Sequence, residues 1–200
     1  EKPNRVVITG DLIDKLAWLP QVCERLTTFA KQIPDGVDFI LGNHEYHHDV
    51  NKVLDELKHN TPMNILVNSN IQIMGGKQPV YIAGVAYDND REKEKREAMI
   101  DKALSGIPDY AFVILLAHHP EFFEEAIERK IPLTLSGHTH GGQIVFMGMP
   151  LVPTGTPYTK GRYVEEQSVC YVNNGSGHWF PIRINCPREI TVITFFDGVA

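Results

Sequence analysis

Histidine is unevenly distributed along this 200-residue chain, and its distribution constrains the fold more than any other feature. Seven of the nine histidines fall in three short windows: His44, His47 and His48; His118 and His119; His138 and His140. Each window follows directly on a strand-like run, and a fourth such run, residues 5–9, is followed in the same way by Asp11. Since ligands of open α/β sheets bind at the carboxyl ends of the strands, we expect these polar side chains to share one sheet edge.

The pattern along the chain predicts an α/β fold with a layered sheet core. Apolar residues recur at helical spacing in residues 20–33, 50–57, 91–104 and 121–130. Strand-like runs cover residues 5–9, 37–41, 65–74, 80–85, 111–117 and 131–135, with a turn at Gly75-Gly76. The last third is β-rich, in residues 143–147, 168–173 and 189–196. Without a repeat or a linker-like segment, residues 1–200 are predicted to form a single domain.

Composition excludes several classes of protein. Hydrophobic residues make up 42% and charged residues 22%, which is typical of a globular protein and not of a disordered chain. The longest strictly apolar run, residues 111–117, is far shorter than the ~20 residues that cross a bilayer. The net charge of −6 gives no general attraction for phosphate backbones, so we expect no nucleic-acid partner and disfavour a nuclease. The three cysteines form no C-x-x-C pair, so neither a zinc ribbon nor a redox motif is indicated.

The side chains at the strand ends are suited to binding a metal. The residues expected to project there are Asp11, Asn43, His44, His118, His138 and His140. Carboxylate, amide and imidazole groups from four strands suit manganese, iron or zinc. A lone histidine is more often a hydrogen-bonded structural residue, and we interpret His59 and His178 in that way.

Four short motifs carry a resemblance to a known family. They are Gly10-Asp11-Leu12-Ile13-Asp14, Gly42-Asn43-His44-Glu45, Leu116-Ala117-His118-His119-Pro120 and Gly137-His138-Thr139-His140-Gly141-Gly142-Gln143. In this order, over residues 5–145, they resemble the motifs of the calcineurin-like metallophosphoesterases. The tail, with Asn173-Asn174-Gly175-Ser176-Gly177, Pro181-Ile182-Arg183 and Pro187-Arg188-Glu189-Ile190, resembles a bacterial branch of phosphodiesterases that are often exported or membrane-attached.

The resemblance implies a layered α/β/β/α sandwich that hydrolyses a phosphodiester or phosphomonoester with a metal-activated hydroxide. It implies two divalent metal ions, manganese, iron or zinc. Asp11 would bridge the two ions, Asn43, His118 and His138 would complete the second, and His140 would bind the first. The substrate would be a small phosphorylated molecule or a lipid-linked phosphate.

His44 has a different implied role, because the resemblance places it beside the scissile group and not on a metal. There it would act as general acid to the leaving oxygen or as a donor to developing charge. His118 is preferred over His119 as the ligand, because the family's ligand stands two residues before Pro120. The reversed assignment of this pair is the alternative.

The chain departs from the family pattern at its beginning. The family starts with a strand that ends in D-x-H, whose aspartate and histidine bind the first metal, and this chain contains no D-x-H. We expect the chain to be a fragment that lacks the first strand. His47 or His48 as a substitute for the missing D-x-H ligands is an alternative that we do not favour, because both lie past the motif. The rival hypothesis is a one-metal protein or a catalytically impaired scaffold. Membrane association through a preceding segment stays open, and so does a cytoplasmic or an exported location.

Overall fold

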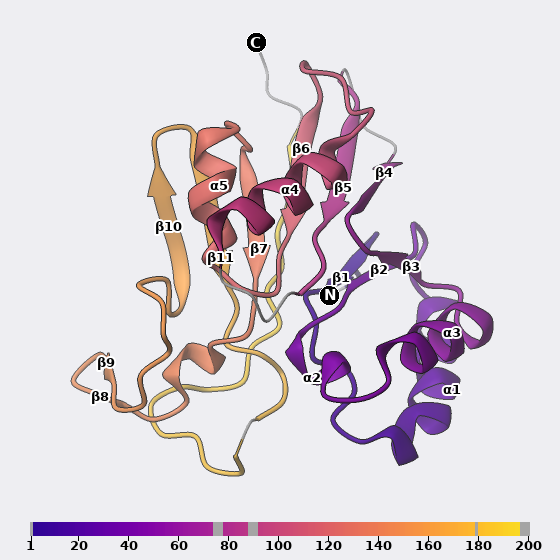
Figure 1. Cartoon of the computed structure of the whole chain (residues 1–200). Helices are drawn as coiled ribbons and strands as arrows, with labels where there is room; N and C mark the ends of the chain where they lie inside the picture. The colour runs from indigo at the N-terminus through magenta and orange to yellow at the C-terminus, as the bar shows by residue number, and fades with distance from the viewer. Residues whose placement is uncertain (1, 74–77, 88–91, 179, 197–200) are drawn as a thin grey trace.

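Two β-sheets form the centre of the computed structural model, which describes residues 2–73, 78–87, 92–178 and 180–196. The first sheet is parallel and consists of β1 (Val6–Ile8), β2 (Val37–Ile40) and β3 (Asn64–Leu66) in that order. In the described part of the chain, the second sheet has six strands, in the order β10 (Gly161–Glu165), β11 (Ser168–Val172), β7 (Leu133–Ser136), β6 (Phe112–Leu116), β5 (Val80–Gly84) and β4 (Ser69–Ile73). Its central strands β5, β6, β7 and β11 are parallel, while β4 and β10 run antiparallel at the two edges (Figure 1).

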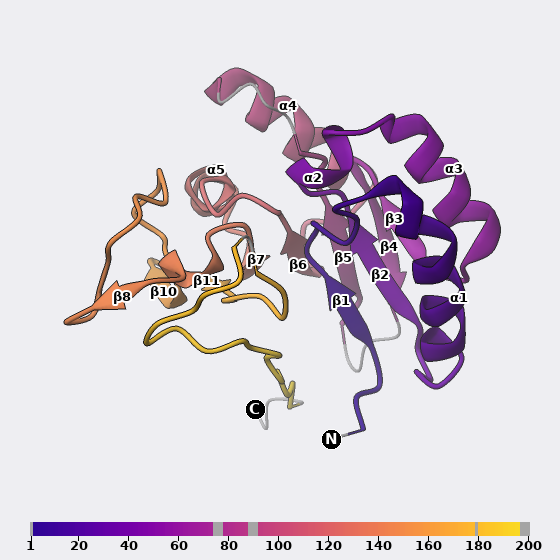
Figure 2. The same ribbon diagram turned by 90° about the horizontal axis from the view of Figure 1, so that it is seen from below.

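Helices cover the outer face of each sheet. α1 (Leu19–Ala30) and α3 (Val50–Asn60) pack on the first sheet, and α4 (Lys93–Leu104) and α5 (Phe122–Glu128) pack on the second (Figure 2). The layer order is therefore α/β/β/α, and the predicted fold class is confirmed. The short elements are η1 (Leu16–Trp18), α2 (Asn43–Tyr46), η2 (His140–Gly142), β8 (Val145–Phe146) and β9 (Met149–Pro150). No helix in the described ranges combines the length and the apolar character that a membrane span requires.

The two sheets pack directly against each other through buried aliphatic side chains. This inner core contains Ile40, Leu66, Ile82, Ile114 and Leu116. Gly84 of β5 allows the close approach, because a Cβ atom there would lie 2.5 Å from Cβ of Leu66 and 2.6 Å from Cγ2 of Ile40. The packing holds the strands of both sheets in fixed positions, so the loops at their ends are fixed as well.

The strand predicted for residues 65–74 is wrong as a single element, because the chain passes from one sheet to the other within it. β3 belongs to the first sheet and β4 to the second. Between them Asn68 has a left-handed backbone with φ of +50°, and its amide oxygen accepts the N–H of Ala86 at 2.8 Å. A residue with this conformation ends a strand, and asparagine tolerates it better than most. The predicted turn at Gly75-Gly76 lies outside the described residues.

The β-rich stretch of residues 189–196 is a second correction, because its described residues form no strand. Ile190 is 86% and Phe196 is 85% exposed. β-Branched and aromatic residues favour strands only where a neighbouring strand pairs with their backbone. Residues 143–147 contain only the two-residue strand β8, which pairs with β9 as a hairpin. The remaining predicted elements are present within a few residues of their expected bounds.

Candidate metal centre

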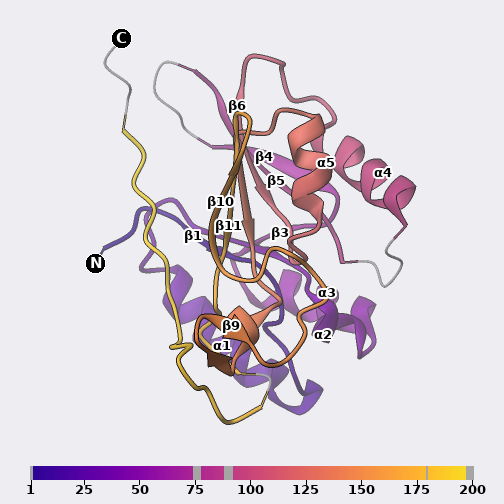
Figure 3. The same cartoon turned by 90° about the vertical axis from the view of Figure 1, so that its left-hand side faces the viewer.

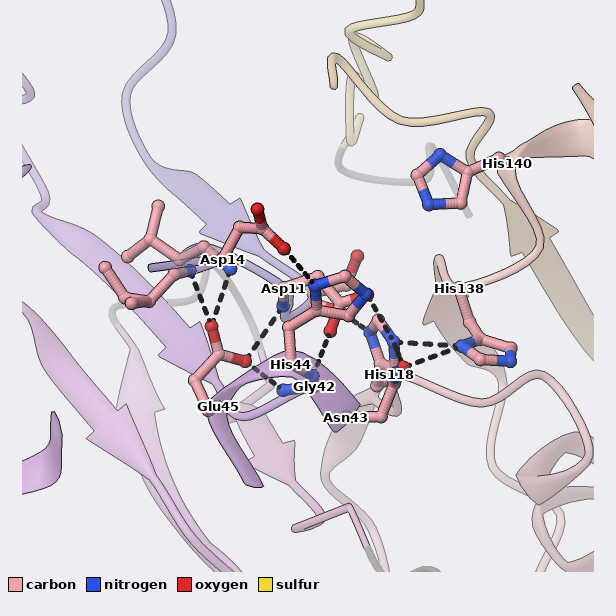
Figure 4. A network of polar contacts seen from close by, with 12 residues as sticks. Asp11, Asp14, Gly42, Asn43, His44, Glu45, His118, His138 and His140 are labelled. Atoms are coloured by element: carbon pink, nitrogen blue, oxygen red, sulfur yellow. Dashed lines mark hydrogen bonds and ion pairs between the residues drawn. The ribbon is translucent and has the colours of Figure 1, made fainter. Parts of the chain in front are cut away.

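Four parallel strands bring polar side chains to one place between the two sheets. Asp11 and Asn43 follow β1 and β2 of the first sheet, whereas His118 and His138 follow β6 and β7 of the second. Each of these residues stands two or three positions after the last residue of its strand. Figure 4 shows their side chains converging, and we call these four residues the donor cluster.

The atoms of the donor cluster have the spacing of ligands around one ion. The Oδ1 atom of Asn43 lies 3.0 Å from both Nε2 of His118 and Nδ1 of His138. The two ring nitrogens are 3.2 Å apart, and Oδ2 of Asp11 is 3.2 Å from Nε2 of His118. Ligand atoms that each lie about 2.0–2.2 Å from a shared transition-metal ion are separated by similar distances. The donor cluster therefore fits a divalent metal ion.

His118 is oriented by the loop that follows β1. Its Nδ1–H donates to the backbone carbonyl of Thr9 at 2.6 Å, which turns Nε2 toward the donor cluster. Gly10, with φ of +96°, lies against the same ring, because a Cβ atom there would be 2.5 Å from Nδ1 of His118. Any residue other than glycine would displace the imidazole from this position.

Charge and burial in the donor cluster favour a cation. Burial alone would raise the pKa of the Asp11 carboxyl, but contacts with His118 and with the backbone N–H of His44 hold the pKa well below its ordinary range. Burial opposes a charge on His118, yet its contact with Asp11 raises the pKa of the imidazole. Burial, with His119 and His118 nearby, lowers the pKa of His138 to about 3, so this ring is neutral at pH 7 and keeps a lone pair.

Glu45 is a structural residue of the site that the sequence did not reveal. Its carboxylate is fully buried and accepts four backbone N–H groups. Oε1 accepts from Leu12 at 2.7 Å and Ile13 at 2.9 Å, and Oε2 accepts from Gly42 at 2.7 Å and Asp11 at 3.0 Å. Burial raises the pKa of Glu45 although these donors oppose the shift. One side chain thus locks together the loops that carry Asp11 and Asn43.

His44 lies beside the donor cluster and not within it. Its Nδ1 is 3.1 Å from Oδ1 of Asp14, and its Nε2 is 3.9 Å from Oδ2 of Asp11. The backbone N–H of His44 donates to Oδ1 of Asp11 at 3.0 Å. The sequence motifs implied no role for Asp14, although a second carboxylate three residues after Asp11 is a usable signal. His47 packs against the ring of His44, and His48 contacts the carbonyl of Asp14, so both lie outside the donor cluster.

His140 is placed apart from the donor cluster, as Figure 4 shows. It begins η2, and its Nδ1 is 3.3 Å from a guanidinium nitrogen of Arg183. Arg183 also donates to the carbonyls of Asn174 at 2.8 Å, Gly177 at 2.7 Å and His140 at 3.3 Å. Burial, together with the charge of Arg183, lowers the pKa of His140 to about 4. We call η2 with Arg183 and residues 174–177 the His140 arm.

His119 contributes to the site by packing. Its ring stacks on His138 with centroids 3.7 Å apart, and its Nδ1 lies 3.4 Å from the carboxylate of Glu121. Nitrogen atoms of His118, His119 and His138 all lie within 4.8 Å of one another. His118, and not His119, contacts Asp11 and Asn43.

The two remaining histidines lie outside the site. The Nδ1–H of His59 donates to the carbonyl of Asp55 at 2.7 Å, one helical turn earlier in α3. His178 lies 3.5 Å from Arg188.

The chain is similar in sequence to known proteins. The chain is 36% identical over 201 residues to an uncharacterized metallophosphoesterase of Campylobacter jejuni, covering 96% of this chain and 50% of that protein. It is 32% identical over 204 residues to a transmembrane protein with metallophosphoesterase domain of Danio rerio, covering 96% of this chain and 45% of that protein. The chain thus spans about half the length of these relatives.

A solved structure has a similar fold. The NAD nucleotidase NadN of Haemophilus influenzae matches with a TM-score of 0.51 and 17% identity, over 85% of this chain and 40% of that one. The sequence profile of the calcineurin-like phosphoesterases matches residues 1–142, which include every residue of the donor cluster. The chain therefore belongs to the calcineurin-like phosphoesterase family.

Proposed function

We propose that this chain is the catalytic part of a metal-dependent phosphoesterase, which hydrolyses a phosphodiester or a phosphomonoester. The observation that carries the proposal is the donor cluster, in which Asn43, His118 and His138 place ligand atoms 3.0–3.2 Å from one another and the carboxylate of Asp11 lies 3.2 Å from His118. Asp11, Asn43, His118 and His138 would hold a divalent ion. When bound, such an ion lowers the pKa of a coordinated water and withdraws charge from a phosphoryl oxygen.

His44 is the proposed proton donor. With Nδ1–H directed to Asp14, its Nε2 faces the side of the donor cluster on which Asp11 lies. In this orientation the ring can give a proton to the leaving oxygen, or donate a hydrogen bond to an oxygen that gains charge in the transition state. The carboxylate of Asp14, whose side chain is 63% exposed, holds the ring in this orientation.

A second ion is part of the proposal. The family resemblance implies two ions, and Asp11 and His140 are the residues that would serve the further one. Imidazole and carboxylate donors suit manganese, iron or zinc for either position. We propose a small phosphorylated or lipid-linked phosphate as substrate, and no nucleic-acid partner, because the chain carries a net charge of −6.

The separate position of His140 favours a second candidate function. With Arg183 next to its Nδ1, His140 is engaged outside the donor cluster. A protein that binds a single ion and lacks efficient turnover, serving as a scaffold, fits this feature.

Elemental analysis combined with a turnover assay separates the two candidates. The purified protein is loaded with Mn²⁺, its metal content is measured, and release of nitrophenol from bis(4-nitrophenyl) phosphate and 4-nitrophenyl phosphate is followed. The phosphoesterase predicts bound metal and Mn²⁺-dependent release, both lost in Asp11→Asn and both retained in the control His59→Ala. Bound metal without release supports the scaffold, and absence of both contradicts the proposed metal centre.

A further inference from the structure

Large apolar side chains gather on the surface next to the site. They belong to the β8–β9 hairpin and to residues 180–184, and we call them the apolar platform. Its members are Phe146, Met147, Met149, Leu151, Phe180, Ile182 and Ile184. Met147 is 82% and Met149 is 66% exposed. The surface of a soluble protein rarely carries so many large apolar side chains together unless they bind something.

Backbone hydrogen bonds join the two segments of the platform. The N–H of Ile184 donates to the carbonyl of Gln143 at 3.0 Å, and the N–H of Val145 donates to the carbonyl of Ile184 at 2.9 Å. The side chain of Gln143, itself buried, donates to the carbonyls of Phe180 at 2.6 Å and Ile182 at 3.0 Å. The exposed side chains are therefore presented by an ordered framework.

The apolar platform is continuous with the metal centre. η2 begins at His140, and Gln143 follows it directly in the chain. Gly142 of η2 packs so closely on Pro150 of β9 that a side chain would not fit there. Figure 1 shows the β8–β9 hairpin at the end of the molecule where β7 finishes, and in Figure 3 β9 lies at the same lower end, below β10 and β11. His138 of the donor cluster follows β7 at this end.

The charge of this region differs from that of the whole chain. Residues 137–188 contain two of the 25 acidic residues, Glu165 and Glu166 where β10 turns into β11, although the chain has a net charge of −6. The same range contains four basic residues, Lys160, Arg162, Arg183 and Arg188, of which Arg162 and Arg188 are exposed. The platform therefore lies among cationic segments and complements an anionic surface.

We propose that the apolar platform docks on the surface of an anionic lipid bilayer. A hairpin tip with exposed phenylalanine, methionine and leucine side chains can enter the boundary between headgroups and acyl chains, while flanking basic residues attract anionic headgroups. Docking in this way turns the sheet edge with the donor cluster toward the headgroups. The proposal concerns binding alone and does not depend on the proposed reaction.

Vesicle co-sedimentation tests the proposal. The protein is mixed with vesicles of phosphatidylcholine containing about 30% phosphatidylglycerol, and with vesicles of phosphatidylcholine alone. We expect partitioning into the anionic vesicles that weakens at about 1 M salt. The double variant Met147→Ser/Met149→Ser should reduce it by about tenfold or more. The matched control is Tyr110→Ser, which removes a side chain that is 72% exposed and lies just before β6, at the opposite edge of the sheet.

Three results would overturn the proposal. The wild-type protein does not sediment with anionic vesicles, or the double variant binds them as well as the control does, or sedimentation velocity shows a dimer that the double variant dissociates. The last result would make the platform an interface between copies of this chain. Turnover of bis(4-nitrophenyl) phosphate should be unchanged in the double variant, so failure of docking and failure of the metal centre are distinguishable.

Discussion

The donor cluster and the His140 arm are close in the chain, because His138 of the cluster and His140 of the arm are two residues apart. The two regions are nevertheless held in different ways. Each donor-cluster side chain follows its strand by two or three residues and contacts at least one other member directly. His140 instead depends on Arg183, which lies 43 residues later in the chain. The end of a strand thus positions the two or three residues that follow it. A residue further along the loop, such as His140, needs an additional contact to hold it in place.

The substitution with the largest expected effect is His44→Ala, which tests whether the donor cluster binds its metal ion without His44. His44→Ala should leave the affinity for Mn²⁺ unchanged and reduce turnover of bis(4-nitrophenyl) phosphate by about 10²–10⁴-fold, because a proton donor is lost. Steady-state kinetics and elemental analysis measure the two quantities. His47→Ala, which removes the exposed imidazole next to His44, is the control. If His44→Ala loses its metal, His44 belongs to the donor cluster.

Two substitutions at neighbouring positions test whether the donor cluster binds its ion independently of the His140 arm. His138→Ala should lower the affinity of the donor cluster for Mn²⁺ by about a hundredfold or more, since an imidazole close to Asn43 and His118 is removed. His140→Ala should leave that affinity nearly unchanged. Titration calorimetry with Mn²⁺ measures both. Equal losses in the two variants would mean that the cluster and the arm form a single site.

Glu45→Gln tests the lock between the two loops of the first sheet. The amide group of glutamine would point an NH₂ at backbone N–H groups that now donate to the carboxylate. We expect the free energy of unfolding to fall by about 2–4 kcal/mol, measured by urea denaturation. The exposed Glu24→Gln on α1 is the control. A change as small as that of the control would remove the structural role assigned to Glu45.

The smallest expected effect concerns the contact between Arg183 and His140. Arg183→Lys replaces a planar guanidinium that spans several carbonyls with a single ammonium group. Turnover should fall by about tenfold, while the Mn²⁺ affinity of the donor cluster stays within about twofold of the wild type. The exposed Arg162→Lys serves as the control. A parallel loss of affinity would show that the arm supports the cluster.

The layered fold could be predicted because its strands and helices are separated by clear changes in apolar spacing. Prediction failed where tertiary context decides the structure. Asn68 ends β3 by adopting a left-handed conformation, and no local pattern announced this change of sheet. Residues 189–196 have the composition of a strand, but a strand also needs a neighbour with free backbone groups, which composition does not show.

The candidate site likewise contains residues that could be predicted from the sequence and residues that could not. Asp11, Asn43, His118 and His138 could be expected to lie close together, because each closely follows a strand-like run of the sequence. Glu45 could not be recognised, since its partners are backbone N–H groups that any residue would provide. The separation of His140 from its neighbour His138 could not be predicted either, because it depends on a contact with Arg183 far along the chain.

The donor cluster takes two members from each sheet, and this has a consequence for folding. A divalent ion held there would cross-link the two halves of the sandwich in addition to the aliphatic core between them. Binding would be linked to assembly of both halves, so the midpoint of thermal unfolding should rise steadily with the Mn²⁺ concentration. Under this linkage neither half could open without releasing the ion, and the whole chain would unfold more cooperatively when it is loaded.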